Sequence, residues 1–174
     1  NRPLHFNGAQ YFYTADLAMD LDKNPPEASR LVEGGELENW LTRSFEKNKT
    51  PERVLEALEQ TKEFGQGKGL EDRLISNLSC ALDTDSPIRY LGRRMMGDGV
   101  GSALAEACSI RKGLEIFHDI FTLGIAMNWT RNQERNTLDI SGMMSKFDSC
   151  RSFMRQDKSG FGLERCLYHI NPEA

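Results

Sequence analysis

The stretch LEDRLISNLSCAL, residues 70–82, decides the fold class of this chain. Leucine recurs at positions 70, 74, 78 and 82, with Ile75 beside them, so the large apolar side chains share one face of an α-helix. The polar run at residues 83–86 and Pro87 then break the chain. We therefore predict a helix over 70–82 that buries its leucine face.

The same kind of signal runs almost from end to end. A helix is predicted to begin at Asn24, Pro25 and Glu27. Asparagine caps a helix, proline is tolerated in the first turn, and a glutamate three residues after the cap is typical of a capping box. Thr50, followed by Pro51, opens another helix in the same way. We expect helices to begin near residues 14, 24, 37, 50, 70, 101, 114, 140 and 163. The chain is therefore predicted to be all-α, a compact bundle of seven to nine helices.

One segment differs from the other predicted helices. Between Leu114 and Trp129 the apolar residues occur almost all the way round a helix. A helix without a polar face belongs in the middle of a bundle. We therefore predict a single helix from Leu114 to Trp129 at the centre of the fold.

A minor β-hairpin is predicted near the N-terminus. Two apolar-aromatic pieces flank Asn7-Gly8, a dipeptide that readily adopts the positive φ angles of a type I′ turn. The order proline, aliphatic, polar, aromatic, any residue, glycine in residues 3–8 recurs in residues 87–92. Six loosely matched positions carry little information, so chance is our first explanation and a duplication is the alternative.

Length and composition indicate a globular domain. The 174 residues are 39% hydrophobic and 28% charged, and no apolar run is long enough for a membrane span or a signal peptide. We expect one domain over residues 1–174, with two subdomains, 1–85 and 86–174, as the alternative. Because the chain lacks an initial methionine, we interpret it as a piece excised from a larger protein. Four widely spaced cysteines predict free thiols and a cytoplasmic location.

Charge is distributed unevenly along the chain. Residues 1–85 carry 10 basic and 16 acidic side chains, whereas residues 86–174 carry 12 and 10. The sequence pI of about 5.5 argues against nucleic-acid binding, which requires a dense basic patch. The positive second half instead predicts docking of an acidic protein surface or, as the alternative, of the acidic N-terminal half of the chain itself. The candidate partner-binding residues are Arg93, Arg94, Arg151 and Arg155.

The pair His118-Asp119 is the first candidate for chemistry. It resembles the central dyad of HD-type metal-dependent phosphohydrolases, which are also all-helical, and the resemblance implies a divalent metal ion that activates water. That family also needs an upstream histidine and a downstream aspartate, for which this chain offers His5 and either Asp139 or Asp148. We expect no bound metal and keep a metal-dependent hydrolase as the alternative function.

The second candidate is a glycine-rich run over residues 97–102, GDGVGS. Glycines before a helix can bring backbone N–H groups to a phosphate. The spacing is not that of the dinucleotide-binding fingerprint, and Asp98 would repel a phosphate, so we interpret the run as a plain helix entry. Residues 65–69 likewise lack the spacing of a P-loop, and residues 157–164 lack the ligand order of a calcium loop.

The function that these observations favour is non-catalytic. We expect a protein–protein interaction or regulatory module of a larger intracellular protein, without a cofactor, whose partner docks in a groove between helices. The oligomeric state and the identity of the partner stay open at this point.

Overall fold

The computed structural model describes residues 2–44, 51–64, 70–133 and 139–172, and these residues form an all-α protein. They contain ten α-helices, so the predicted fold class is confirmed. The chain divides into two compact units, residues 1–92 and 93–174. None of the described helices combines the length and apolar character needed to cross a membrane. The proposed cap Thr50 and the glycine-rich residues 65–69 lie outside the described residues.

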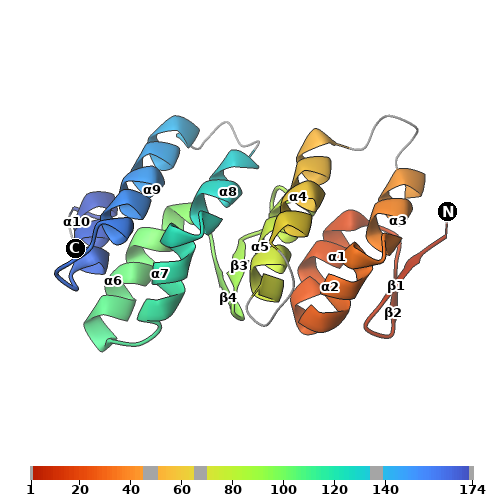
Figure 1. Ribbon diagram of the computed structural model, residues 1–174, viewed down its shortest axis with the longest axis horizontal. Coiled ribbons are helices and arrows are strands. Elements are labelled where there is room, and N and C mark those ends of the chain that lie inside the picture. The colour runs from red at the N-terminus through yellow and green to blue at the C-terminus, as the bar shows by residue number, and fades with distance from the viewer. Residues whose placement is uncertain (1, 45–50, 65–69, 134–138, 173–174) are drawn as a thin grey trace. The chain divides into compact units, whose positions relative to one another are not determined.

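Unit 1 consists of a hairpin, five helices and a strand (Figure 1). Helix α5 corresponds to the predicted leucine helix and packs against α1, α2, α4 and β3. Every residue of α5 from Leu74 to Leu82 is buried, so this helix holds the centre of the unit. The elements of unit 1 are β1 (Leu4–Phe6), β2 (Ala9–Tyr11), α1 (Thr14–Asp20), the 3₁₀ turn η1 (Leu21–Lys23), α2 (Pro25–Glu33), α3 (Glu36–Ser44), α4 (Glu52–Glu63), α5 (Leu70–Leu82) and β3 (Ile88–Tyr90).

The N-terminal hairpin is confirmed, and hydrogen bonds at the N-cap of α2 tie it to that helix. Strands β1 and β2 pair antiparallel, and Asn7 and Gly8 form the turn with φ angles of 50° and 79°. The Asn24 side chain accepts a hydrogen bond from the Glu27 backbone N–H, as the sequence predicts for a capping box. The Glu27 carboxylate in turn accepts a hydrogen bond from the Asn7 backbone N–H at 3.0 Å. The start of α2 therefore also fixes the hairpin turn.

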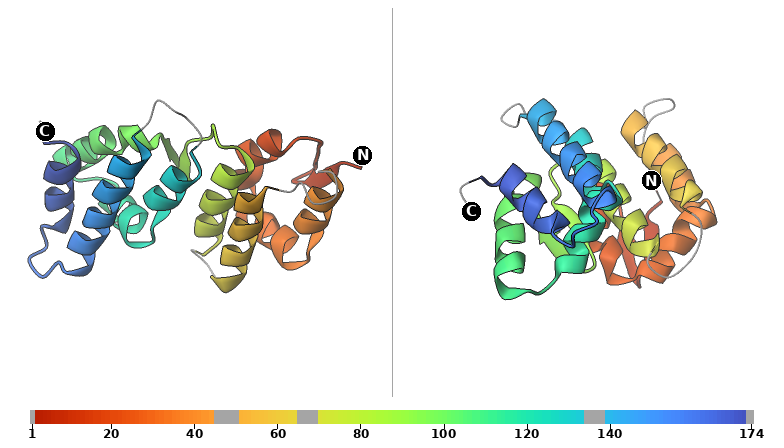
Figure 2. Two further views of the ribbon diagram at one scale, coloured as in Figure 1. Left: turned by 90° about the horizontal axis from the view of Figure 1, so that it is seen from above. Right: turned by 60° about the vertical axis from the view of Figure 1, so that its left-hand side comes forward.

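Unit 2 is built from one strand and five helices, and its helices α9 and α10 lie side by side in all views (Figure 2). Helix α9 is also packed against α7 and α8, while α10 contacts α6 and α7. The elements of unit 2 are β4 (Arg93–Met95), the 3₁₀ turn η2 (Gly97–Gly99), α6 (Val100–Ile110), α7 (Leu114–Thr122), α8 (Ile125–Arg131), α9 (Ile140–Arg155) and α10 (Gly162–Ile170).

The segment from Leu114 to Trp129 is two helices, α7 and α8, and not the single helix that we expected. Gly124 has φ 71°, a left-handed conformation that a right-handed helix does not accommodate. The break lets two short helices turn separate apolar faces into the core, which explains why the sequence is apolar on all sides. It also raises the number of helices to ten in the described residues, one more than the expected maximum.

The two halves of the chain repeat one order of elements. Two strands and five helices, β1 to α5, are followed by two strands and five helices, β3 to α10. We call residues 4–82 the first repeat and residues 88–170 the second repeat. Leu91 and Gly92, with φ angles of 49° and 77°, reproduce the left-handed pair Asn7-Gly8. The correspondence between residues 3–8 and 87–92 therefore extends to backbone conformation.

Buried positions in the helices recur at a separation of 89 residues. Gly35 and Gly124 both have positive φ angles, and each is followed five residues later by a buried tryptophan, Trp40 or Trp129. The Arg73 guanidinium lies over the Phe64 ring at 4.1 Å, and Arg165 lies over Phe153 at 4.0 Å. Six pairs of buried residues share this separation: Ala28 and Phe117, Leu31 and Ile120, Val32 and Phe121, Leu37 and Ala126, Trp40 and Trp129, Leu41 and Thr130. A chance similarity between residues 3–8 and 87–92 does not account for this agreement along the helices.

Trp129 packs directly on the backbone of Gly97 in unit 2. A Cβ atom placed on Gly97 would lie 2.1 Å from Cζ3 of the Trp129 ring, whereas a Cβ on Gly99 would meet nothing within 4 Å. Trp129 is 1% exposed and has no free space into which to retreat. Residue 97 must therefore be glycine for the tryptophan to occupy its site.

We predict that Gly97→Ala lowers the free energy of unfolding by about 2–3 kcal/mol, because the added methyl group overpacks the core. The control variant Gly99→Ala changes the same quantity by less than about 1 kcal/mol, since its methyl group enters open space. Urea denaturation of both variants, followed by circular dichroism, measures the difference. Equal midpoints for the two variants would contradict the described packing.

A second prediction concerns Tyr11, whose hydroxyl donates to the Asp20 carboxylate at 2.6 Å. Burial, together with this hydrogen bond, raises the pKa of Tyr11 to about 12, and the bond from Tyr11 lowers the pKa of Asp20. The folded state therefore favours the neutral phenol. Its stabilising contribution is complete below the ordinary tyrosine pKa of about 10 and is lost as pH rises towards about 12.

Replacing Tyr11 by phenylalanine should destabilise the protein at neutral pH by about 1.5–3 kcal/mol, as expected for a hydrogen bond to a charged group. It should also remove this tyrosine's part of the stability lost between pH 10 and 12. Tyr13→Phe is the matched control, because Tyr13 is 71% exposed. Denaturant unfolding over a pH series checks both statements, and they fail if Tyr11→Phe and Tyr13→Phe show the same alkaline slope.

Candidate functional site

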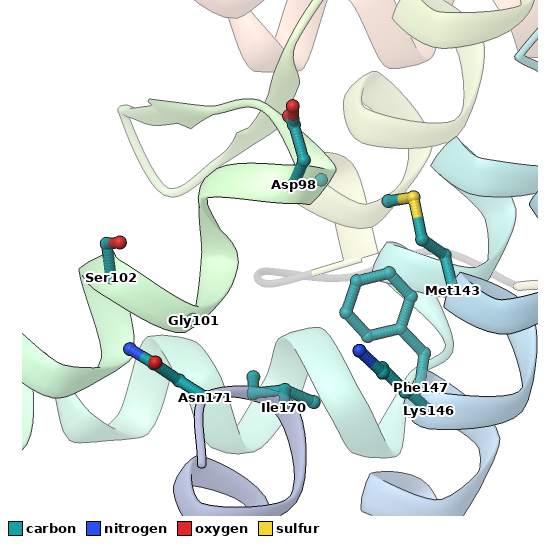
Figure 3. A pocket seen from close by; sticks show the side chains of 9 residues that line it. Asp98, Gly101, Ser102, Met143, Lys146, Phe147, Ile170 and Asn171 are labelled. Carbon is teal, nitrogen blue, oxygen red and sulfur yellow. The ribbon is translucent and has the colours of Figure 1, made fainter. Parts of the chain in front are cut away.

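A cavity of about 280 Å³ lies within unit 2, between the start of α6, the first half of α9 and the end of α10 (Figure 3). Its volume suits one or two side chains and falls just below that of most small-molecule sites, about 300–1,000 Å³. The lining residues are Gly97, Asp98, Gly101, Ser102, Met143, Lys146, Phe147, Ile170 and Asn171. All of them belong to one unit, so the cavity is a property of that unit alone.

The apolar part of the lining comes from α9 and α10. Met143 and Phe147 are one helical turn apart on α9 and therefore share a face of that helix. Ile170, the last residue of α10, lies across from them. Phe147 is 4% exposed, whereas Met143 and Ile170 retain part of their surface in contact with solvent. An apolar side chain inserted here would cover surface that water now contacts.

The polar part of the lining comes mainly from the edges of the cavity. Asp98 lies in the 3₁₀ turn η2, and Ser102 lies in the first turn of α6. Lys146 is next to Phe147 on α9, and Asn171 follows α10 (Figure 3). Asp98, Ser102 and Lys146 are exposed, and Asn171 is partly exposed. The edge therefore offers one carboxylate, one ammonium group, a hydroxyl and an amide. Such a mixed edge suits the backbone and polar side chains of a peptide segment better than a single highly charged ligand.

The glycine-rich run at residues 97–102 is a helix entry, as expected, and two of its glycines serve packing. Gly97 accommodates Trp129, as described above. A Cβ on Gly101 would approach Cβ of Asn171 to 3.3 Å and the carbonyl oxygen of Ile170 to 3.6 Å. Gly101 therefore lets the end of α10 come close to α6, and this approach closes one wall of the cavity.

The four arginines predicted to bind a partner all lie in unit 2, but none of them lines the cavity. Arg93 and Arg94 belong to β4, and Arg151 and Arg155 belong to α9. A Cβ on Gly113 would come within 2.9 Å of Nη1 of Arg93, so this guanidinium lies against the start of α7. Arg151 lies in the same way near Gly124, at the start of α8. Arg93, Arg94 and Arg155 are exposed, and Arg151 is half-buried.

The His118 and Asp119 side chains are in contact, as the sequence suggested, but among the described residues they belong to no larger group of metal ligands. Nδ1 of His118 lies 3.5 Å from Oδ1 of Asp119, and the two side chains are 55% and 35% exposed. Asp139 accepts a hydrogen bond from the backbone N–H of Gly142 and thus caps α9. Within the described part of the chain, no group of three or more His, Cys, Asp or Glu side chains could hold a metal ion. The metal-hydrolase alternative gains no support from this geometry.

Sequence reasoning did not find the cavity. Met143 and Phe147 have the helical spacing of ordinary core residues, and Ile170 and Asn171 marked only the end of a helix. The one available signal was the pair of small residues Gly101-Ser102 at the start of α6, which indicates close approach of another element. Which element approaches is a matter of tertiary structure.

Cysteine burial agrees with the expectation of free thiols. Cys80, Cys150 and Cys166 are buried, Cys108 is partly exposed, and none of these four described cysteines forms a disulfide. A hydrogen bond with Cys150, together with burial, raises the pKa of the Cys166 thiol. Cys166 is therefore held in the unreactive protonated form and contributes packing between α9 and α10.

Comparison with protein-family models, curated proteins and solved structures finds no match to this chain. The functional interpretation therefore rests on the residues and contacts of the chain itself.

Proposed function

We propose that this chain is a non-catalytic protein-interaction or regulatory module, and that its second unit binds a segment of a protein partner in the cavity at α6, α9 and α10. The observation that carries the proposal is the composition of the cavity: an apolar wall of Met143, Phe147 and Ile170 below an edge of mixed polarity. One apolar anchor side chain of the partner fits the volume, and the edge can pair with its backbone.

The repeat supports the same function by a separate argument. Proteins built from repeated helical segments expose extended surfaces, and such surfaces commonly serve binding. Both halves of this chain have the same element order and the same buried positions. The four described cysteines form no disulfide, which favours a reducing compartment, for which we propose the cytoplasm.

The cavity can be blocked without touching the core. Ser102 is exposed and lines the cavity, so Ser102→Trp should fill the space that the anchor side chain needs. Ser109 is exposed on the same helix and does not line the cavity, so Ser109→Trp is the matched control. Both variants should retain the unfolding free energy of the parent within about 0.5 kcal/mol.

We expect selection from a random peptide display library to enrich ligands for the parent protein. Ser102→Trp should weaken their binding by about tenfold or more, equivalent to about 1.4 kcal/mol, and Ser109→Trp should not. Binding is measured by titration calorimetry with the enriched peptides. The proposal is wrong if no peptide is enriched, or if Ser102→Trp binds the enriched peptides as tightly as the parent.

The electrostatic part of the proposal concerns Arg93, Arg94, Arg151 and Arg155 and an acidic partner surface. Arg155 gives the clearest test, because it is exposed near the end of α9 and can be changed without disturbing packing. Arg155→Glu should lower the affinity for an acidic enriched peptide several-fold at low salt. The difference in affinity between parent and variant should shrink in about 0.5 M salt, because the charges are screened. Arg155→Gln should have about half the effect, and unchanged affinity in both variants would remove this part of the proposal.

A further inference from the structure

We propose that the β1–β2 hairpin of a second copy of this chain docks over the cavity of unit 2 and presents the exposed His5 side chain to it. The inference rests on the proposed function, because it names the partner segment for the same cavity. The basis of the proposal is the contact of strand β3 with α5 and α1 in the first repeat. The second repeat has the helices that correspond to α5 and α1.

In unit 1 a strand covers the helices α5 and α1. Strand β3 packs against α5, and the Arg89 side chain on β3 donates a hydrogen bond to the carbonyl of Ala18 on α1. Arg89 is 6% exposed, and Ile88 and Tyr90 on either side of it are also buried. The strand therefore packs on α5 and is linked to α1 through the Arg89 side chain.

In unit 2 the corresponding helices are α10 and α6, and the cavity lies where they meet. Gly101 and Ser102 of α6 and Ile170 and Asn171 of α10 line it. Whereas α5 is buried over its whole second half, α10 buries only Gly162 and Cys166. Tyr168 on α10 is 65% exposed. The surface that β3 covers on the first repeat is thus open on the second.

The segment that fits this surface is present at the other end of the chain. Strand β1 has the residue pattern of β3, with His5 at the position of Arg89. His5 is exposed and borders an open cavity of about 470 Å³ in unit 1, together with Glu36, Asn39, Thr42 and Arg43 of α3. A second copy therefore presents strand β1, which has the residue pattern of β3. It also presents the open cavity beside His5, which can accommodate residues at the ends of α6 and α10.

The charges of the two units favour this contact between copies. Unit 1 carries 11 basic and 16 acidic side chains, and unit 2 carries 11 and 10. A contact of unit 1 of one copy with unit 2 of the next joins a unit of net charge −5 to one of net charge +1, whereas a contact between two copies of unit 1 would join two acidic units. Because the two surfaces differ, the contact is head-to-tail, and it propagates into open chains unless the rotation closes a ring.

Sedimentation velocity of the full chain over a wide concentration range tests the proposal. We expect species larger than a monomer that grow with concentration. Ser102→Trp, which blocks the cavity, and His5→Glu, which sets a carboxylate against a helix carbonyl, should each weaken association by about tenfold or more. His5→Arg should tighten it, because arginine makes the corresponding contact in unit 1. Ser109→Trp should leave it unchanged.

Mixing the two weakened variants gives the decisive result. Ser102→Trp retains a working hairpin and His5→Glu retains a working cavity, so an equimolar mixture should form a discrete dimer that neither variant forms alone. A parent chain that stays monomeric at all concentrations, or a mixture that behaves as the sum of its parts, overturns the proposal.

Failure of this inference is distinguishable from failure of the proposed function. If the parent is monomeric but Ser102→Trp lowers its affinity for the enriched peptides, the cavity binds a different partner. In that case only the inference of a second copy is wrong. If Ser102→Trp affects neither association nor peptide binding, both fall together.

Discussion

The contact between Trp129 and the backbone of Gly97 is the constraint on which the second unit depends. The ring leaves no room for a side chain at position 97, so it determines where the 3₁₀ turn η2 lies and where α6 starts. The first turn of α6 then forms one wall of the cavity, and Gly101 on that turn admits the end of α10. A single aromatic residue of the core thus positions the site, although it does not line it.

The repeated order of elements shows how the same constraint is reused. In both repeats a left-handed glycine ends one helix, and the next helix turns a tryptophan into the core. In both, an arginine lies over a phenylalanine where the fourth and fifth helices meet. The repeats differ mainly at their surfaces, since α5 is covered by a strand and α10 carries an exposed tyrosine.

Local signals predicted most of the fold. The leucine spacing of residues 70–82, the N-cap at Asn24 and the Asn7-Gly8 turn depend on neighbouring residues only, and all three were confirmed. The break at Gly124 was missed, because a glycine in an apolar helix pattern does not reveal its own φ angle. The cavity was missed for a different reason: Met143 and Ile170 are 27 positions apart in the sequence, and only the packing of α10 on α9 brings them together.

The two buried tryptophans allow the folding of each unit to be followed by fluorescence. The sequence contains two of them, Trp40 in unit 1 and Trp129 in unit 2, and both are 1% exposed. Buried indole rings fluoresce at shorter wavelength than hydrated ones, so each unit contains its own optical reporter of tertiary structure. A chain in which one indole is replaced by phenylalanine would emit from one unit alone. The order in which the two halves lose their structure can then be followed by light, half by half, in the intact polypeptide.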